Sequence, residues 1–110
     1  MLHCNMTSIA ALQLGLDDLL ADLRHARRGG DLGRLALLAY CEVRRWARSA
    51  GEADVAQHAA EMITASPHAS RAEFLEHIDD LIHELEEVRP RLAVDSSSFG
   101  NLGSAGRAAA

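Results

Sequence analysis

Residues 35–41 (Leu-Ala-Leu-Leu-Ala-Tyr-Cys) would be apolar around almost the whole circumference of a helix. A surface helix of a globular protein needs only one apolar stripe, so a helix that is apolar on most sides must contact more than one neighbour. We therefore expect this segment at the packing centre of a small all-α domain, or in contact with another chain.

Four segments have the spacing of amphipathic helices, and they cover residues 8–27, 32–50, 52–65 and 71–88. The last is the clearest, because apolar residues recur at steps of four and three after a capping box formed by Ser70 and Glu73. No alternating strand pattern of useful length competes. The sequence predicts an all-α fold, an antiparallel four-helix bundle with short connections. A three-helix arrangement with 52–65 as an appendage is the main alternative.

The chain of 110 residues has room for one domain and one core. Pro90 is expected to end or kink the last helix. Residues 95–110 are mostly Ser, Gly and Ala, a composition that cannot bury a core. We expect a helical bundle domain over residues 1–94 and a disordered tail over residues 95–110.

The second predicted helix has two apolar sides. One is a seam along which residues step by four and three: Leu32, Ala36, Ala39, Val43, Trp46 and Ala50. Leu37, Leu38 and Cys41 fall on the other side, beside Arg45 and Arg48. If a monomeric bundle leaves this second side exposed, it is an apolar patch suited to a partner or to a second copy. The other possibility is that the bundle core takes up the whole helix.

Charge and cysteine content narrow the class of protein. The net charge is −5, which argues against a dedicated nucleic-acid binder, although Arg44, Arg45 and Arg48 form a local basic group. The two cysteines, Cys4 and Cys41, make no disulfide framework, and we expect a reducing compartment. With no secretory signal and no apolar run long enough to span a bilayer, we expect a cytoplasmic protein without a membrane contact.

Carboxylate and imidazole side chains on the last helix and its neighbour form a candidate metal site. Asp80 and His83 lie on one polar face of residues 71–88, and His77 and Glu84 lie on its shoulder. His58 borders the apolar stripe of residues 52–65 and could supply a further ligand. These are ligand types that zinc and similar divalent ions prefer. The ordinary alternative is a solvated polar face with partly packed histidines.

No catalytic or cofactor motif stands out, so function is inferred partly by elimination. We expect a non-enzymatic helical module that binds another protein, as an adaptor, chaperone-like or regulatory unit, and that can form a homodimer. Its predicted interface is Leu37, Leu38, Cys41, Arg45 and Arg48. A metal-binding or metal-responsive bundle is the alternative. An enzyme is a third class, for which the sequence nominates no residues.

Overall fold

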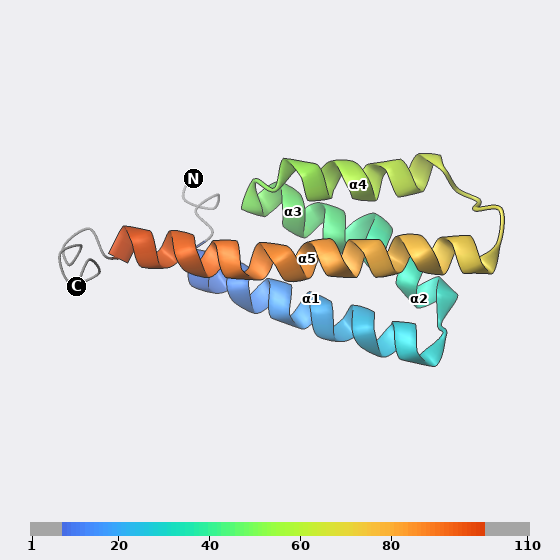
Figure 1. The fold of residues 1–110 in the computed structure, drawn as a ribbon, viewed down its shortest axis with the longest axis horizontal. Coiled ribbons are helices and arrows are strands. Elements are labelled where there is room, and N and C mark those ends of the chain that lie inside the picture. Colours follow the sequence, from blue (N-terminus) through green and yellow to red (C-terminus); the bar gives the residue numbers. More distant parts are fainter. Residues whose placement is uncertain (1–7, 101–110) are drawn as a thin grey trace.

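The computed structural model describes the backbone of residues 8–100 and the side chains of residues 8–92, and the described residues contain no strand. Its elements are α1 (Ile9–Gly29), α2 (Leu32–Leu37), the π-helical segment η2 (Leu38–Val43), α3 (Arg44–Ala50), α4 (Ala53–Thr64) and α5 (Arg71–Gly100). α2, η2 and α3 follow one another without a break, and we call this rod of residues 32–50 the second helix. The predicted all-α fold with four packed helices is confirmed (Figure 1).

The helices begin and end where local chemistry predicts. The hydroxyl of Ser8 accepts a hydrogen bond from the amide of Ala11 at 3.0 Å, which caps α1. Gly30 and Gly51 end α1 and α3 with φ angles of 67° and 73°, a left-handed conformation that glycine adopts without strain. Ser70 accepts from the amide of Glu73 at 3.1 Å, so α5 starts at the predicted capping box.

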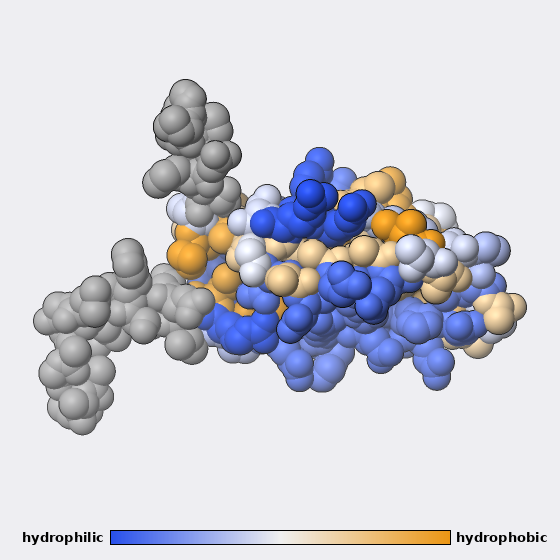
Figure 2. Space-filling view, turned by 90° about the horizontal axis from the view of Figure 1, so that it is seen from above, coloured by the Kyte–Doolittle hydropathy of each residue, from blue (hydrophilic) through white to orange (hydrophobic). Residues whose placement is uncertain are grey.

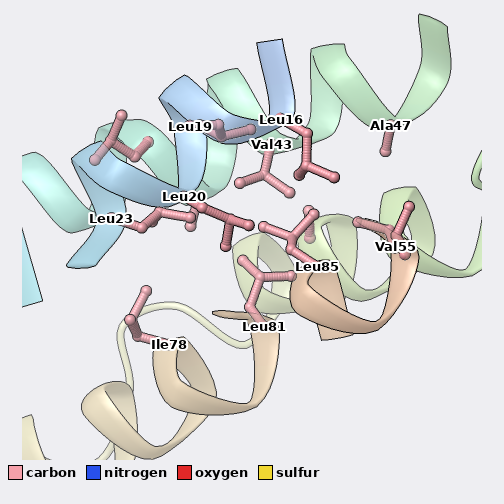
Figure 3. Packing of buried hydrophobic residues seen from close by; sticks show 14 of the residues in the cluster. Leu16, Leu19, Leu20, Leu23, Val43, Ala47, Val55, Ile78, Leu81 and Leu85 are labelled. Carbon is pink, nitrogen blue, oxygen red and sulfur yellow. The ribbon is translucent and has the colours of Figure 1, made fainter. Parts of the chain in front are cut away.

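Successive helices pack as neighbours around one core. α1 packs against α5 and the second helix, and α4 packs against the second helix and α5. In Figure 1, α5 crosses the front, with α1 below it and α3 and α4 above. Leucine, isoleucine and valine side chains from all four rods meet in the interior (Figure 3). The predicted stripe of α5, residues Phe74, Ile78, Leu81, Leu85 and Val88, is buried throughout.

The second helix buries only two residues of the predicted seam, Ala39 and Val43. Its core residues are Leu35, Leu38, Ala39, Val43 and Ala47, whereas the seam residues Leu32, Ala36, Trp46 and Ala50 are only half-buried. A π-helical turn holds more residues than an α-helical turn, so η2 rotates the following residues relative to the core. Steps of four from residue 35 to residue 47 therefore stay on the buried side.

α5 continues through Pro90 to Gly100, so the predicted end at Val88 is wrong. The physical reason is packing beyond the proline: Leu92, one turn after Val88, is only 4% exposed. Arg91 also forms an ion pair of 2.7 Å with Glu52. The predicted disordered tail begins within α5, and its remainder, residues 101–110, lies outside the described residues.

Ion pairs join α1 to α5 along their length. Arg89 donates a hydrogen bond from Nε to Oδ1 of Asp17 at 2.8 Å, and Arg27 does the same to Asp79 at 2.8 Å. The hydrogen bond from Arg89 lowers the pKa of the Asp17 carboxyl below its usual range, and the bonds to Asp17 and Asp79 raise the pKa of each arginine. Of the ion pairs between the two helices, Arg24–Glu86 and Arg27–Asp79 place the arginine on α1, and Arg89–Asp17 places it on α5.

Candidate functional site

A groove with a volume of about 490 Å³ lies between α1 and the second helix. Its floor includes Leu12 and Leu38 from the core, and its sides include Trp46 and Leu37. Leu12 and Leu38 are buried, Trp46 is half-buried, and Leu37 is 51% exposed. The groove therefore presents large apolar side chains to solvent beside a well-packed interior.

Trp46 is held in the groove by two contacts with α1. Its indole Nε1 donates a hydrogen bond to the backbone carbonyl of Leu12 at 3.0 Å. Its ring also lies against Gly15, where an added Cβ would be 3.3 Å from Cδ1 of the indole. Trp46, which the sequence places on the apolar seam of the second helix, is therefore only half-buried. A tryptophan with its N–H satisfied and part of its ring exposed is typical of binding surfaces.

Two leucines near this groove are the most exposed large apolar side chains in the described part of the chain: Leu14 is 63% exposed and Leu37 is 51% exposed. Leu14 is three residues from Ala11 and four from Asp18, both of which line the groove. Residues at these spacings are neighbours on a helix surface. Leu14 therefore lies beside the groove on α1 without lining it, whereas Leu37 lines the opposite wall.

Charges of both signs surround the groove. Arg34 lies 3.9 Å from Asp22 across the gap between the two helices. Arg45 pairs with Glu42 on its own helix, and the arginine side chain stays 74% exposed. Exposed pairs of this kind contribute little to folding stability, so their carboxylates and guanidinium groups remain able to contact a partner.

The residues of the predicted interface differ in their exposure to solvent. Leu37, Cys41, Arg45 and Arg48 are exposed, as an interface requires. Leu38 is only 3% exposed and belongs to the core, so its assignment to the interface is wrong.

The candidate metal ligands do not come together as a site. Nδ1 of His58 lies 2.7 Å from Oε1 of Glu84, which joins α4 to α5 at a half-buried edge. His77 instead approaches Glu73, and His83 approaches Glu87 at 3.2 Å. Asp80 is exposed on α5. Within residues 8–92, no three His, Cys, Asp or Glu side chains form a group able to hold a metal ion.

Comparisons of the chain with protein-family models, with curated proteins and with solved structures gave no significant match. Among the described residues, none of the helices is both long enough and apolar enough to cross a bilayer.

The groove itself was missed by reasoning from the sequence, although one signal pointed to it. Gly15 lies inside a strongly periodic helix, where glycine costs roughly 1 kcal/mol relative to alanine. A glycine at such a position indicates that another group approaches the backbone closely. The approaching group is Trp46, from a segment 31 residues away in sequence, and only the packing of the rods reveals it.

Proposed function

We propose that this protein is a small helical module that binds another protein through the groove between α1 and the second helix. The observation that carries the proposal is the set of large apolar side chains in and beside this groove: exposed Leu37 and half-buried Trp46 line it, and exposed Leu14 lies next to it on α1. Large solvent-exposed apolar groups with a charged rim are typical of protein-binding surfaces.

The apolar surface that a partner would cover is large enough to contribute to binding. Burying one leucine side chain completely is worth roughly 1.5–3 kcal/mol. Leu14 and Leu37 are each more than half exposed, so a partner that covers both gains about half of that value from each. Tryptophan is enriched among the residues that dominate binding energy, so further burial of Trp46 adds to this gain. An amphipathic helix of the partner fits such a groove between two helices.

The experiment replaces both rim leucines with glutamate, as Leu14→Glu with Leu37→Glu. A matched control is Ile63→Glu, since Ile63 is a 36% exposed apolar residue on α4, outside the groove. Proteins retained on the immobilised chain are identified, and the interaction is then measured by calorimetry with the purified partner. The double variant is expected to keep the helix content of the parent chain and lose binding, whereas Ile63→Glu keeps both.

The proposal is overturned if the double variant binds the purified partner as tightly as the parent chain does. Light scattering on the parent chain tests whether the partner is a second copy. A dimer that dissociates in the leucine double variant, but not in Ile63→Glu, identifies the groove as a surface for self-association. No second function is proposed, since the described residues offer no geometry that favours metal binding over this interaction.

A further inference from the structure

Arg44 and Arg48 line two depressions that adjoin on the outer side of the bundle. One has a volume of about 470 Å³ and lies between α3 and α4, where Ala53 and Ala56 form part of its wall. The other has a volume of about 500 Å³ and includes Tyr40 and Arg45. Because both arginines line both depressions, the two form one surface. We call it the arginine groove, and define it by Tyr40, Arg44, Arg45, Arg48, Ala53 and Ala56.

The positive charge of this groove is available for a ligand. Six arginines of the described chain lie within 4.0 Å of a carboxylate: Arg24, Arg27, Arg34, Arg45, Arg89 and Arg91. Arg44 and Arg48 are exposed and form no ion pair with any residue that the structure describes. They are four residues apart, so they lie on the same face of α3 and repel each other. An anion placed between them removes that repulsion.

The lining of the groove is neutral apart from its arginines, of which Arg45 already pairs with Glu42. The part contributed by α4 consists of Ala53, Ala56 and Gln57, and no carboxylate is among the described residues that line either depression. Figure 2 looks onto the side of α3 and α4, and it shows a pale, weakly apolar strip between strongly hydrophilic surfaces. The surface therefore combines two unpaired guanidinium groups with a neutral, small-residue floor on which a chain can lie.

We propose that the arginine groove binds an acidic segment of the partner protein. Arg44 and Arg48 donate charge-assisted hydrogen bonds to its carboxylates, and Ala53, Ala56 and Tyr40 contact the apolar parts of the same segment. The inference deepens the proposed function and rests on it, because it names the chemistry of the partner. The arginine groove adjoins the groove between α1 and the second helix, which we call the leucine groove, since Arg45 and Ser49 line both.

An acidic protein segment explains the surface better than a nucleic acid does. A duplex carries one negative charge for about every 1.7 Å of its axis, so its binding requires a long positively charged track. Here the unpaired arginines form a short group on a chain with a net charge of −5. A short acidic segment can pair with that group without extending over the surrounding acidic surface.

The test uses a synthetic peptide of alternating glutamate and alanine, with a peptide of alternating glutamine and alanine as the charge control. Binding to the full chain is followed by heteronuclear NMR. The glutamate peptide is expected to shift amide signals of α3 and the first turn of α4 and to bind more weakly as salt is added. The double variant Arg44→Gln with Arg48→Gln is expected to weaken binding by about tenfold or more.

The control variant is Arg28→Gln with Arg71→Gln. It removes the same charge from two exposed arginines outside the groove, neither of which forms an ion pair with a described residue. It should retain the affinity of the parent chain. The proposal is overturned if both double variants weaken binding equally, or if the glutamine peptide binds as well as the glutamate peptide. It is also overturned if a single-stranded oligonucleotide binds more tightly through Arg44 and Arg48.

The two proposals fail separately. If the glutamate peptide does not bind, while partner binding still depends on Leu14 and Leu37, only the acidic-segment proposal is wrong. If the glutamate peptide binds through Arg44 and Arg48, but the leucine variants leave the affinity for the purified partner unchanged, the leucine groove is not the main contact and the proposed function is wrong. Circular dichroism of each variant confirms that the helices are retained.

Discussion

Leu37 and Leu38 are adjacent in the chain but differ sharply in burial, and truncating each to alanine separates their roles. Leu38 is 3% exposed, and a buried leucine replaced by alanine costs about 3–4 kcal/mol, since transfer energy is lost and a cavity remains. Leu37 is 51% exposed and has less contact to lose. Alanine also favours the helix slightly, so Leu37→Ala should cost about 0.5 kcal/mol or less.

The difference is measurable by urea unfolding, followed by far-ultraviolet circular dichroism and by the fluorescence of Trp46, the single tryptophan. A domain of this size has a free energy of unfolding of roughly 5–15 kcal/mol, and the dependence on urea is about 1–1.5 kcal/mol per molar. Leu38→Ala should therefore lower the unfolding midpoint by about 2–4 M. Leu37→Ala should leave it almost unchanged.

A third variant, Leu81→Ala, is the positive control, because Leu81 on α5 is fully buried and should be as costly as Leu38. Equal midpoints for Leu37→Ala and Leu38→Ala would refute the placement of η2 described above. A large loss for Leu37→Ala alone would mean that the second helix is rotated so that Leu37, and not Leu38, faces the core.

Two further predictions concern contacts of α1. Replacing Gly15 with leucine should displace the Trp46 indole from the Leu12 carbonyl, shift its fluorescence to longer wavelength and destabilise the fold by about 1–3 kcal/mol, whereas Gly29→Leu, in open space, should do neither. Asp17→Asn should cost about 0.5 kcal/mol or less at neutral pH, because the Asp17–Arg89 pair is exposed. Since the folded-state pKa of Asp17 is lowered, the pair stabilises the fold above the ordinary pKa of 3.8, and this contribution disappears as the pH falls through the folded-state value. Acid titrations of the two chains that stay parallel down to the lowest pH would contradict this.

Helix positions were predictable because their signals are local. The Ser8 cap, the glycine at position 51 and the capping box of Ser70 and Glu73 each act through hydrogen bonds or backbone angles within a few residues. The core face of α5 was equally predictable, since its apolar stripe is narrow and its opposite face is charged. The same stripe continues to Leu92 after Pro90, and the proline was given too much weight against it.

The candidate site was predictable only in part. Leu37, Arg45 and Arg48 are exposed as predicted, but the sequence did not show that Leu37 shares a groove with Trp46. His58 and Glu84 do meet at the edge between α4 and α5, because both border the apolar stripes of packed helices. His83 does not join them, since it lies on the solvent side of α5.

By itself, the sequence determined that four helices form and which face of three of them is apolar. A helix with one apolar stripe and a charged opposite face can bury its apolar surface in only one orientation. Only the tertiary structure decided how the second helix is oriented. Residues 35–41 are apolar on nearly every side, so hydrophobicity cannot choose between Leu37 and Leu38. The choice is made by the extra residue that η2 takes into its turn and by the fit of Trp46 against Gly15, and both depend on the neighbouring helices being in place.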